Sequence, residues 1–361
     1  MSGNGARAAT TIPDRPTNVI WDVTYACPLR CTHCYSESGR RPSRQLDQAD
    51  LLRVADAIVS LRPDGVALAG GEPLLVKGIF EVAGRIARAG IPVVCYTGGW
   101  SLPPWMVEAA QSVFAQVIVS VDGATAEVHD RIRGRAGSFD RAMAALARLD
   151  EAARERRAAG AQPLAFGIDC VVVRSNFHQI EQLCTAVAPR FPELGHLTFG
   201  AVVPAGLASR PSFGEHELLT DEQAELLGDP AQTRRLQSLA PASVQVTATD
   251  NRILQMHPDL LARGVVFPAM QVEPDGAVRA MPIYEGTVGN LLTDPPAELW
   301  RRAVARWADP FVTRTLAPVR SMAQWAEAAR RLDHHFGSAE VRARIERRPT
   351  YAPPALGSRA V

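Results

Sequence analysis

Six short runs of apolar, β-branched residues, each followed by a stretch with helical character, recur at steady spacing along this chain. The runs cover residues 19–24, 66–69, 91–96, 117–121, 165–173 and 197–202. Strands that alternate with helices form a parallel sheet with the helices outside it, and right-handed crossovers curl that sheet. A closed barrel of this kind needs eight units. The pattern therefore predicts an α/β fold, a partial (β/α)6 TIM-like barrel over residues 16–215.

Capping residues in the sequence should mark where the intervening helices begin and end. Asp47 is a suitable N-cap for the first of them, and Gly90 would end the second. We expect these helices near residues 48–60, 75–89, 139–158 and 177–187, with another directly after Pro104.

The alternation stops after Pro211, and a small α+β domain is expected over residues 216–348. Its features are an isolated apolar run at 244–249, a hairpin at 271–278 and helices near 297–308 and 323–335. Pro274-Asp275-Gly276 supplies the residues that a tight hairpin turn requires. Residues 1–15 read as a flexible N-terminus and residues 349–361 as a disordered tail.

Composition narrows the class of function. The chain carries a net charge of +1, which gives no electrostatic reason for nucleic-acid or membrane binding. Almost all of its positive charge is arginine, and Lys77 is the one lysine. No segment resembles a signal peptide or a membrane span. Six cysteines fit a reducing compartment better than a disulfide framework, so a cytoplasmic protein is expected.

Three of the cysteines stand close together directly after the first apolar run. Cys27, Cys31 and Cys34 have the spacing C-x3-C-x2-C. Thiolates select zinc, copper(I) or iron–sulfur clusters, and three of them without a fourth suit a cubane with one open iron. A zinc site that adds His33 is the alternative, although adjacent His33 and Cys34 reach one ion with difficulty. A buried helix face is a third interpretation, which Pro28 disfavours.

A second motif, Gly70-Gly71-Glu72-Pro73, follows the second apolar run. Its two glycines allow the backbone to approach a ligand closely, and the glutamate can accept from an ammonium group. Alone, the motif could be an ordinary turn. One βα unit after the cysteine motif, it resembles the methionine-binding turn of radical S-adenosylmethionine (radical SAM) enzymes, whose cluster has the same cysteine spacing.

The resemblance extends over roughly residues 18–305. Within the radical SAM enzymes, the sequence is similar to the SPASM/twitch branch. It rests on Thr97-Gly98-Gly99, Ser120-Val121-Asp122-Gly123, Arg133-Gly134, Gly137-Ser138-Phe139, Pro204-Ala205-Gly206, the 272–278 hairpin, Val288-Gly289-Asn290-Leu291 and Glu298-Leu299-Trp300. That branch normally carries cysteines for auxiliary clusters around the hairpin. Here Met270 and Met281 flank it, and no cysteine follows Cys184. We therefore expect a degenerate extension without auxiliary clusters, in which the two methionines fill core space.

The resemblance implies two cofactors, a [4Fe–4S] cluster and S-adenosylmethionine (SAM), and a flavodoxin or ferredoxin as electron donor. Cys27, Cys31 and Cys34 would hold the cluster. The residues implied to bind SAM are His33, Tyr35, Gly70, Gly71, Glu72, Pro73, Thr97, Ser120, Asp122 and Asp169. Within that set, Gly70 to Glu72 would hold the methionine moiety, His33 and Tyr35 would pack near the adenine, and Ser120 and Asp122 would reach the ribose.

The implied function is reductive cleavage of SAM and hydrogen abstraction from a small metabolite such as a sugar or nucleoside. Without auxiliary clusters the outcome should be redox-neutral, as in an epimerase, lyase or mutase. A maturase of a ribosomally made peptide and a non-catalytic iron–sulfur or SAM sensor are the alternatives.

Two carboxylates, Asp22 and Asp169, interrupt apolar strand runs. A charge there must face the barrel interior with a partner or ligand, unless it pairs with an arginine or lies at a strand edge. The remaining cysteines, Cys95, Cys170 and Cys184, are expected in the core, with a hydrogen-donor thiol among them as the alternative. Adjacent His334 and His335 are expected on the surface.

Overall fold

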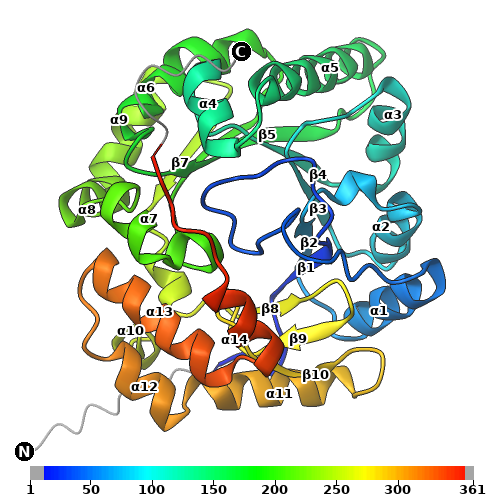
Figure 1. Cartoon of the computed structure of the whole chain (residues 1–361). Coiled ribbons are helices and arrows are strands. Elements are labelled where there is room, and N and C mark those ends of the chain that lie inside the picture. Colours follow the sequence, from blue (N-terminus) through cyan, green and yellow to red (C-terminus); the bar gives the residue numbers. More distant parts are fainter. Residues whose placement is uncertain (1–11, 354–361) are drawn as a thin grey trace, which may run out of the picture.

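A computed structural model describes residues 12–353, which form one curved sheet with helices around its outer face (Figure 1). The sheet has ten strands in the order β10-β9-β8-β1-β2-β3-β4-β5-β6-β7. The run from β1 to β7 is parallel throughout, with each strand beside its successor in sequence. The predicted partial barrel of α/β type is confirmed.

The strands of the barrel have short and regular bounds. They are β1 (Asn18–Thr24), β2 (Gly65–Gly70), β3 (Val93–Thr97), β4 (Gln116–Ser120), β5 (Ala165–Val172), β6 (His196–Ala201) and β7 (Gln245–Thr249). The last of these corrects the sequence analysis, which expected an isolated run at 244–249. β7 pairs in parallel with β6, so the alternation extends beyond Pro211.

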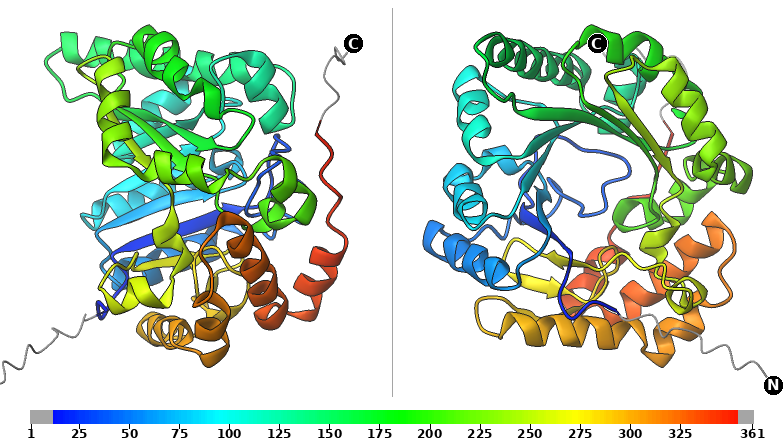
Figure 2. Two further views of the ribbon diagram at one scale, coloured as in Figure 1. Left: turned by 90° about the vertical axis from the view of Figure 1, so that its left-hand side faces the viewer. Right: turned by 180° about the vertical axis from the view of Figure 1, so that it is seen from behind.

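Helices cover the outer face of this sheet, as both views of Figure 2 show. Those that follow β1 to β5 are α1 (Gln48–Ser60), α2 (Ile79–Arg88), α3 (Pro104–Val113), α4 (Ala126–Arg133), α5 (Ser138–Ala158) and α6 (Ile180–Gln182). α1 begins as predicted, because the Asp47 carboxylate accepts from the backbone N–H of Asp50. Those that follow β6 are α7 (Pro211–His216), α8 (Asp221–Gly228) and α9 (Pro230–Leu239).

Strand periodicity determines which side chains enter the barrel. In β1, Val19, Trp21 and Val23 are fully buried against the helices, whereas Asp22 points the other way, into the interior. The same alternation leaves Tyr96 of β3 and Asp169 of β5 on the inner face. The inner face is therefore partly polar, although these strands are parallel and central.

The C-terminal part adds to the same sheet. β8 (Ala269–Val272) pairs in parallel with β1, and β9 (Ala277–Arg279) and β10 (Thr287–Asn290) follow in antiparallel order. The predicted hairpin is confirmed, with Gly276 at φ +82° in its turn. The helices of this part are α10 (Pro258–Ala262), α11 (Pro296–Trp307), α12 (Pro310–Leu316), α13 (Met322–Phe336) and α14 (Ala339–Glu346).

Several helix limits differ from expectation. The helix expected at 75–89 begins only at Ile79, because a 3₁₀ turn over Pro73–Leu75 and Gly78 at φ +81° precede it. The helix expected at 177–187 is a series of short 3₁₀, α and π turns. Helix α4 was not predicted at all. No helix within residues 12–353 is long and apolar enough to cross a membrane.

Both ends of the described chain form hydrogen bonds with the rest of the molecule. Of the N-terminal residues, Pro13 accepts from Trp300 Nε1 at 2.9 Å. At the other end Tyr351 is buried, and its hydroxyl donates to Glu217. The flexibility expected at 1–15 and 349–361 stays a prediction, and residues 1–11 and 354–361 lie outside the described residues.

Candidate active site

The cysteine loop, residues 25–40, follows β1 and crosses the carboxyl end of the barrel, where active sites of parallel α/β folds lie (Figure 1). Backbone hydrogen bonds hold it on two sides. Arg30 N–H donates to the carbonyl of Arg133 at 3.0 Å, and Thr32 N–H donates to that of Ile132 at 2.9 Å. On its other side, Leu207 N–H donates to the Cys34 carbonyl at 3.0 Å.

Gly206 makes this last contact possible. It has φ +53°, and a Cβ at this position would lie 2.1 Å from the Tyr35 carbonyl oxygen and 2.6 Å from that of Cys34. No side chain fits in that space. The turn after β6, predicted from Pro204-Ala205-Gly206, is thus packed directly against the last cysteine of the motif.

The three motif cysteines are half-buried in this loop. Burial raises the pKa of Cys27 to about 12, and the neighbouring Cys31 thiol adds to the effect. Burial also raises the pKa of Cys31 to about 11, against the lowering effect of Arg133. Burial therefore disfavours the thiolate form of both groups, and a bound cation would favour it.

A single metal ion and a cluster place different demands on the ligands of this loop. Within residues 12–353, no three His, Cys, Asp or Glu side chains converge as they would around one metal ion. In a cubane each cysteine binds a different iron, so the three sulfurs need not meet at one point. His33, the proposed fourth zinc ligand, faces Asp122 at 3.6 Å through Nε2 instead. Its buried Nδ1 has no hydrogen-bond partner in the described part of the chain.

The Gly-Gly-Glu-Pro turn is joined to the start of the cysteine loop. Gly71 N–H donates to the Thr24 carbonyl at 2.7 Å, and Glu72 N–H donates to that of Ala26 at 2.9 Å. A Cβ on Gly71 would lie 2.1 Å from the Ala26 oxygen, so this approach requires glycine. Gly70 turns the chain with φ +108°. The two sequence motifs therefore form one unit in space.

The Glu72 carboxylate is already engaged by protein groups. Thr97 Oγ1 donates to it at 2.8 Å and Gly98 N–H at 2.9 Å, and Leu74 N–H donates at 3.3 Å. The side chain is buried, which raises its pKa, and these hydrogen bonds lower it. Glu72 thus connects the turn after β2, which includes Pro73, to the turn after β3. This position differs from a free carboxylate awaiting an ammonium group.

Asp122 is also engaged by protein groups. It is fully buried, its Oδ1 accepts from Val171 N–H at 2.9 Å, and its Oδ2 forms an ion pair with Arg133 Nε at 2.7 Å. The nearby Arg133 cation helps to hold the pKa of Asp122 below its usual range although burial opposes this. No carboxylate oxygen of Asp122 is exposed, and its expected contact with a ribose stays a prediction.

Arg133 is a site residue that sequence reasoning missed. It ends helix α4, is buried beside Asp122, and places Nη1 3.9 Å from Cys31 Sγ. In the sequence, the Arg133-Gly134 pair contributes only to the family resemblance. No local signal marks Arg133 as a neighbour of the cysteine motif, since α4 itself was not predicted.

Tyr35 likewise has a different partner from the one expected. Its hydroxyl donates to Asp22 Oδ1 at 2.6 Å, and Gln271 of β8 donates to Oδ2 at 2.9 Å. Burial raises the pKa of Asp22 to about 6, and the Tyr35 hydrogen bond lowers it in part. Asp22 therefore does face the interior, with neutral partners and not with an arginine ion pair.

Asp169 and Ser120 lie in register on neighbouring strands of the inner face, and Thr198 stands on the other side of Asp169. Both Ser120 and Asp169 are half-buried. Burial, and then Asp122, raise the pKa of Asp169 to about 6. Tyr96, 39% exposed although it lies in a central strand, faces the same space. Asp169 and Tyr96 thus belong to a polar, solvent-accessible inner surface.

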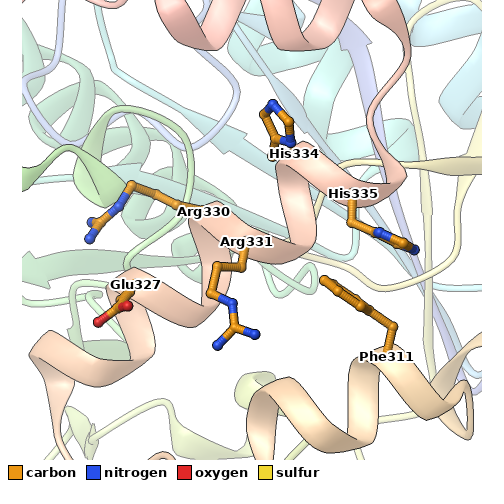
Figure 3. A pocket seen from close by; sticks show the side chains of 6 residues that line it. All are labelled: Phe311, Glu327, Arg330, Arg331, His334 and His335. Atoms are coloured by element: carbon orange, nitrogen blue, oxygen red, sulfur yellow. The ribbon is translucent and has the colours of Figure 1, made fainter.

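The other singled-out residues lie where they were expected. Cys95, Cys170 and Cys184 are buried, and burial raises the pKa of each thiol. Met270 and Met281 are in the core. Figure 3 shows His334 and His335 at a shallow cavity of about 360 Å³ between α12 and α13, where His335 stacks on Phe311. None of the candidate SAM or cluster residues lines that cavity.

With this geometry established, comparison with known proteins gives the family. Residues 21–159 match the family model described as the Radical SAM superfamily. This chain therefore contains a Radical SAM domain over those residues. The match contains the cysteine loop, the Gly-Gly-Glu-Pro turn and helix α4. The family resemblance inferred from the motifs is confirmed, and the expected cofactors are those that this superfamily uses.

Among curated relatives, the mycofactocin maturase MftC of Mycolicibacterium smegmatis is 33% identical over 49% of this chain and 43% of its own length. The AdoMet-dependent heme synthase of Methanosarcina barkeri is 32% identical over 53% of this chain and 52% of its own. The chain thus matches only about half the length of either relative.

Solved structures share the fold over a longer stretch. SuiB of Streptococcus suis, bound to S-adenosylmethionine, has a TM-score of 0.59 at 15% identity, covering 83% of this chain and 68% of SuiB. SuiB bound to the precursor peptide SuiA has the same TM-score and covers 95% of this chain. At this identity the likeness shows a common fold.

Proposed function

We propose that this chain is a radical SAM enzyme that acts on a peptide substrate. A [4Fe–4S] cluster with bound SAM supplies, on one-electron reduction, methionine and a 5′-deoxyadenosyl radical that can abstract hydrogen from a C–H bond. The observation that carries the proposal is that two backbone hydrogen bonds, to the carbonyls of Thr24 and Ala26, join the Gly-Gly-Glu-Pro turn to the chain directly before Cys27.

The chain's own residues bind and orient the two cofactors in this proposal. The three cysteines would hold the cluster. The backbone of Gly70 and Gly71 would receive the methionine moiety, with Glu72, Pro73 and Thr97 keeping that turn rigid. Ser120 and Asp169 would face the nucleoside from the inner surface. His33 offers its unpartnered Nδ1, and Asp122 and Tyr35 act by positioning their neighbours.

The peptide class replaces the small metabolite as the first choice. Its support is similarity to a mycofactocin maturase and a shared fold with SuiB, which was crystallised with a precursor peptide. The heme synthase relative, at nearly equal identity, supports a tetrapyrrole as the second candidate. We keep the redox-neutral outcome as part of the proposal, because buried methionines occupy the positions flanking the hairpin.

Transfer of deuterium from the substrate to 5′-deoxyadenosine distinguishes the peptide candidate from the tetrapyrrole candidate. The reconstituted chain, SAM and dithionite would be incubated with perdeuterated peptides from genes adjacent to its own, and separately with a perdeuterated iron porphyrin. We expect deuterium in 5′-deoxyadenosine only with a peptide. Deuterium from the porphyrin alone would reject the peptide class and leave the radical SAM assignment intact.

A further inference from the structure

A small cavity lies between helices α10 and α13, in the C-terminal part of the molecule (Figure 1). Its volume is about 190 Å³, and its walls come from residues between 252 and 263 and between 319 and 325. None of the candidate SAM or cluster residues lines it. Enclosed organic ligands need roughly 300–1,000 Å³, so this α10–α13 cavity has room only for a smaller molecule or ion.

The imidazole of His257 has an N–H donor opposite each of its two nitrogens. Nδ1 lies 3.1 Å from the backbone nitrogen of Asp259, whose N–H it accepts as the N-cap of α10. Nε2 lies 3.0 Å from Nη1 of Arg320. A neutral imidazole has one acceptor nitrogen, and a guanidinium group has none. In either tautomer one donor therefore faces another, at a side chain that is only 6% exposed.

The protein groups around this contact do not resolve it. Nη1 of Arg320 carries two hydrogens, and it already donates to the carbonyls of Ala317 at 2.7 Å and Val319 at 2.8 Å. The Asp259 carboxylate lies 3.7 Å from His257 Nδ1 and 3.9 Å from Arg320 Nη2, beyond ordinary hydrogen-bond distance. With Nδ1 accepting from the backbone, the Nε2–H of His257 is thus left without an acceptor.

Gln255 is a second buried polar side chain at the same cavity. It is 7% exposed, and its backbone carbonyl accepts from the Tyr284 hydroxyl at 3.1 Å. Its side-chain amide forms no hydrogen bond with any residue between 12 and 353. A buried amide without a partner costs free energy, so a missing partner is to be expected in the cavity that Gln255 lines.

The charge of the lining residues indicates what that partner is. Arg252, Arg263 and Arg320 line the cavity, and Asp259 is the one acidic residue among the lining residues of the described chain. Its side chain is 69% exposed, so it lies largely in solvent. Arginines without a carboxylate partner occur elsewhere on this surface, and charge alone would not mark a site. Here they adjoin two buried groups that lack partners, and such a concentration of donors suits an oxyanion.

We propose that the α10–α13 cavity binds a phosphate-sized oxyanion, which accepts from His257 Nε2–H, the Gln255 amide and the guanidinium groups of the lining arginines. The bound ion would join residues 252–260, in the connection from β7 to β8, to the start of α13. The site shares no residue with the candidate active site, so this inference goes beyond the proposed function and does not depend on it.

Titration calorimetry of the reconstituted chain with inorganic phosphate, at constant ionic strength, tests the site. We expect one ion per chain. His257→Asn keeps an N-cap for α10 but loses Nε2–H, and Arg320→Leu loses the guanidinium; each should weaken binding by about tenfold or more. Arg314→Gln removes an exposed arginine of α12 that does not line the cavity, and it should bind phosphate as the wild type does.

Thermal unfolding gives a second measurement of the same site. Saturating phosphate should raise the melting temperature of the wild type by about 2 °C or more, because the ion binds only the folded chain. Gln255→Leu, which loses the amide but keeps the side-chain bulk, should show less than half of that shift. Each variant is compared with its own phosphate-free sample, so a change in basal stability does not affect the result.

Free phosphate and the phosphoryl group of a metabolite offer the same chemistry, and glycerol 3-phosphate distinguishes them. The small volume predicts that it binds more weakly than the free ion; equal affinity would identify a phosphorylated metabolite as the ligand of the same site. The inference is overturned if the wild type shows no saturable binding up to about 10 mM phosphate. It is also overturned if His257→Asn, Arg320→Leu and Gln255→Leu all bind phosphate as tightly as Arg314→Gln.

Discussion

Arg133 sits between a buried carboxylate and the sulfur of Cys31, and neither contact is visible in the sequence pattern. Its ion pair with Asp122 is closed to solvent, and Asp122 also holds the backbone of β5 through Val171. Removing one partner of such a pair leaves an uncompensated charge in a low-dielectric region. We infer that the pair fixes the loop and that the guanidinium adds positive charge beside the cluster.

Arg133→Gln should therefore lower the free energy of unfolding by about 3–5 kcal/mol. Asp122→Asn/Arg133→Gln should recover most of that loss, since the introduced amide oxygen can still accept from Val171. Urea denaturation of the cluster-free chain measures both. In reconstituted protein the single variant should also show a lower cluster reduction potential, because a cation near the reduced cluster is lost. Equal stability of the single and double variants would show that the pair's charge is unimportant.

The roles of some site residues could be predicted from the sequence, whereas the partners of others could not. The cysteines, the glycines of the turn and the core methionines were predictable, because spacing and composition carry their roles. Glu72, Tyr35 and Asp122 were found at the right place but with protein partners in place of cofactor groups. Their partners come from other strands and turns, and a single sequence does not show which groups will bind a given buried oxygen.

Three turns, after β1, β2 and β6, meet to form the site, and two of them meet through glycine. Helix periodicity and strand runs predicted the barrel, including the start of α1. The broken helical segment at 177–187 and the unpredicted α4 show where local patterns fail. α4 spans only Ala126–Arg133 and is held by the cysteine loop and α5, so its tertiary contacts matter more than its own sequence pattern.

Gly206→Ala tests the contact between the β6 turn and the cysteine loop. A methyl group there would strike the Tyr35 and Cys34 carbonyl oxygens, so the loop must move. We expect the iron and sulfide bound after anaerobic reconstitution to fall well below half of the wild-type amount, with the far-ultraviolet circular dichroism unchanged. Gly160→Ala, also at a positive φ but with nothing near the new Cβ, is the matched control. Full cluster loading in Gly206→Ala would show that the contact is dispensable.

Considered as a whole, the molecule joins its C-terminal part to the barrel more closely than the domain division at residue 216 suggests. β7 forms one edge of the sheet, and β8, β9 and β10 continue the sheet beyond β1 to the other edge. Glu37 of the cysteine loop accepts from Arg344 and Arg348, and Arg344 also reaches Glu285. Sequence patterns separated the two parts because only one alternates, whereas long-range strand pairing depends on neighbours far away in the chain.

Formation of 5′-deoxyadenosine tests the central claim most directly. Anaerobically reconstituted chain with SAM and dithionite should yield 5′-deoxyadenosine and methionine, slowly even without substrate, because an open iron beside the Gly-Gly-Glu-Pro turn would hold SAM where an electron can reach it. Cys31→Ala should yield none. If the wild-type chain forms no more 5′-deoxyadenosine than Cys31→Ala, with or without peptide substrate, the enzyme assignment fails and a non-catalytic sensor takes its place.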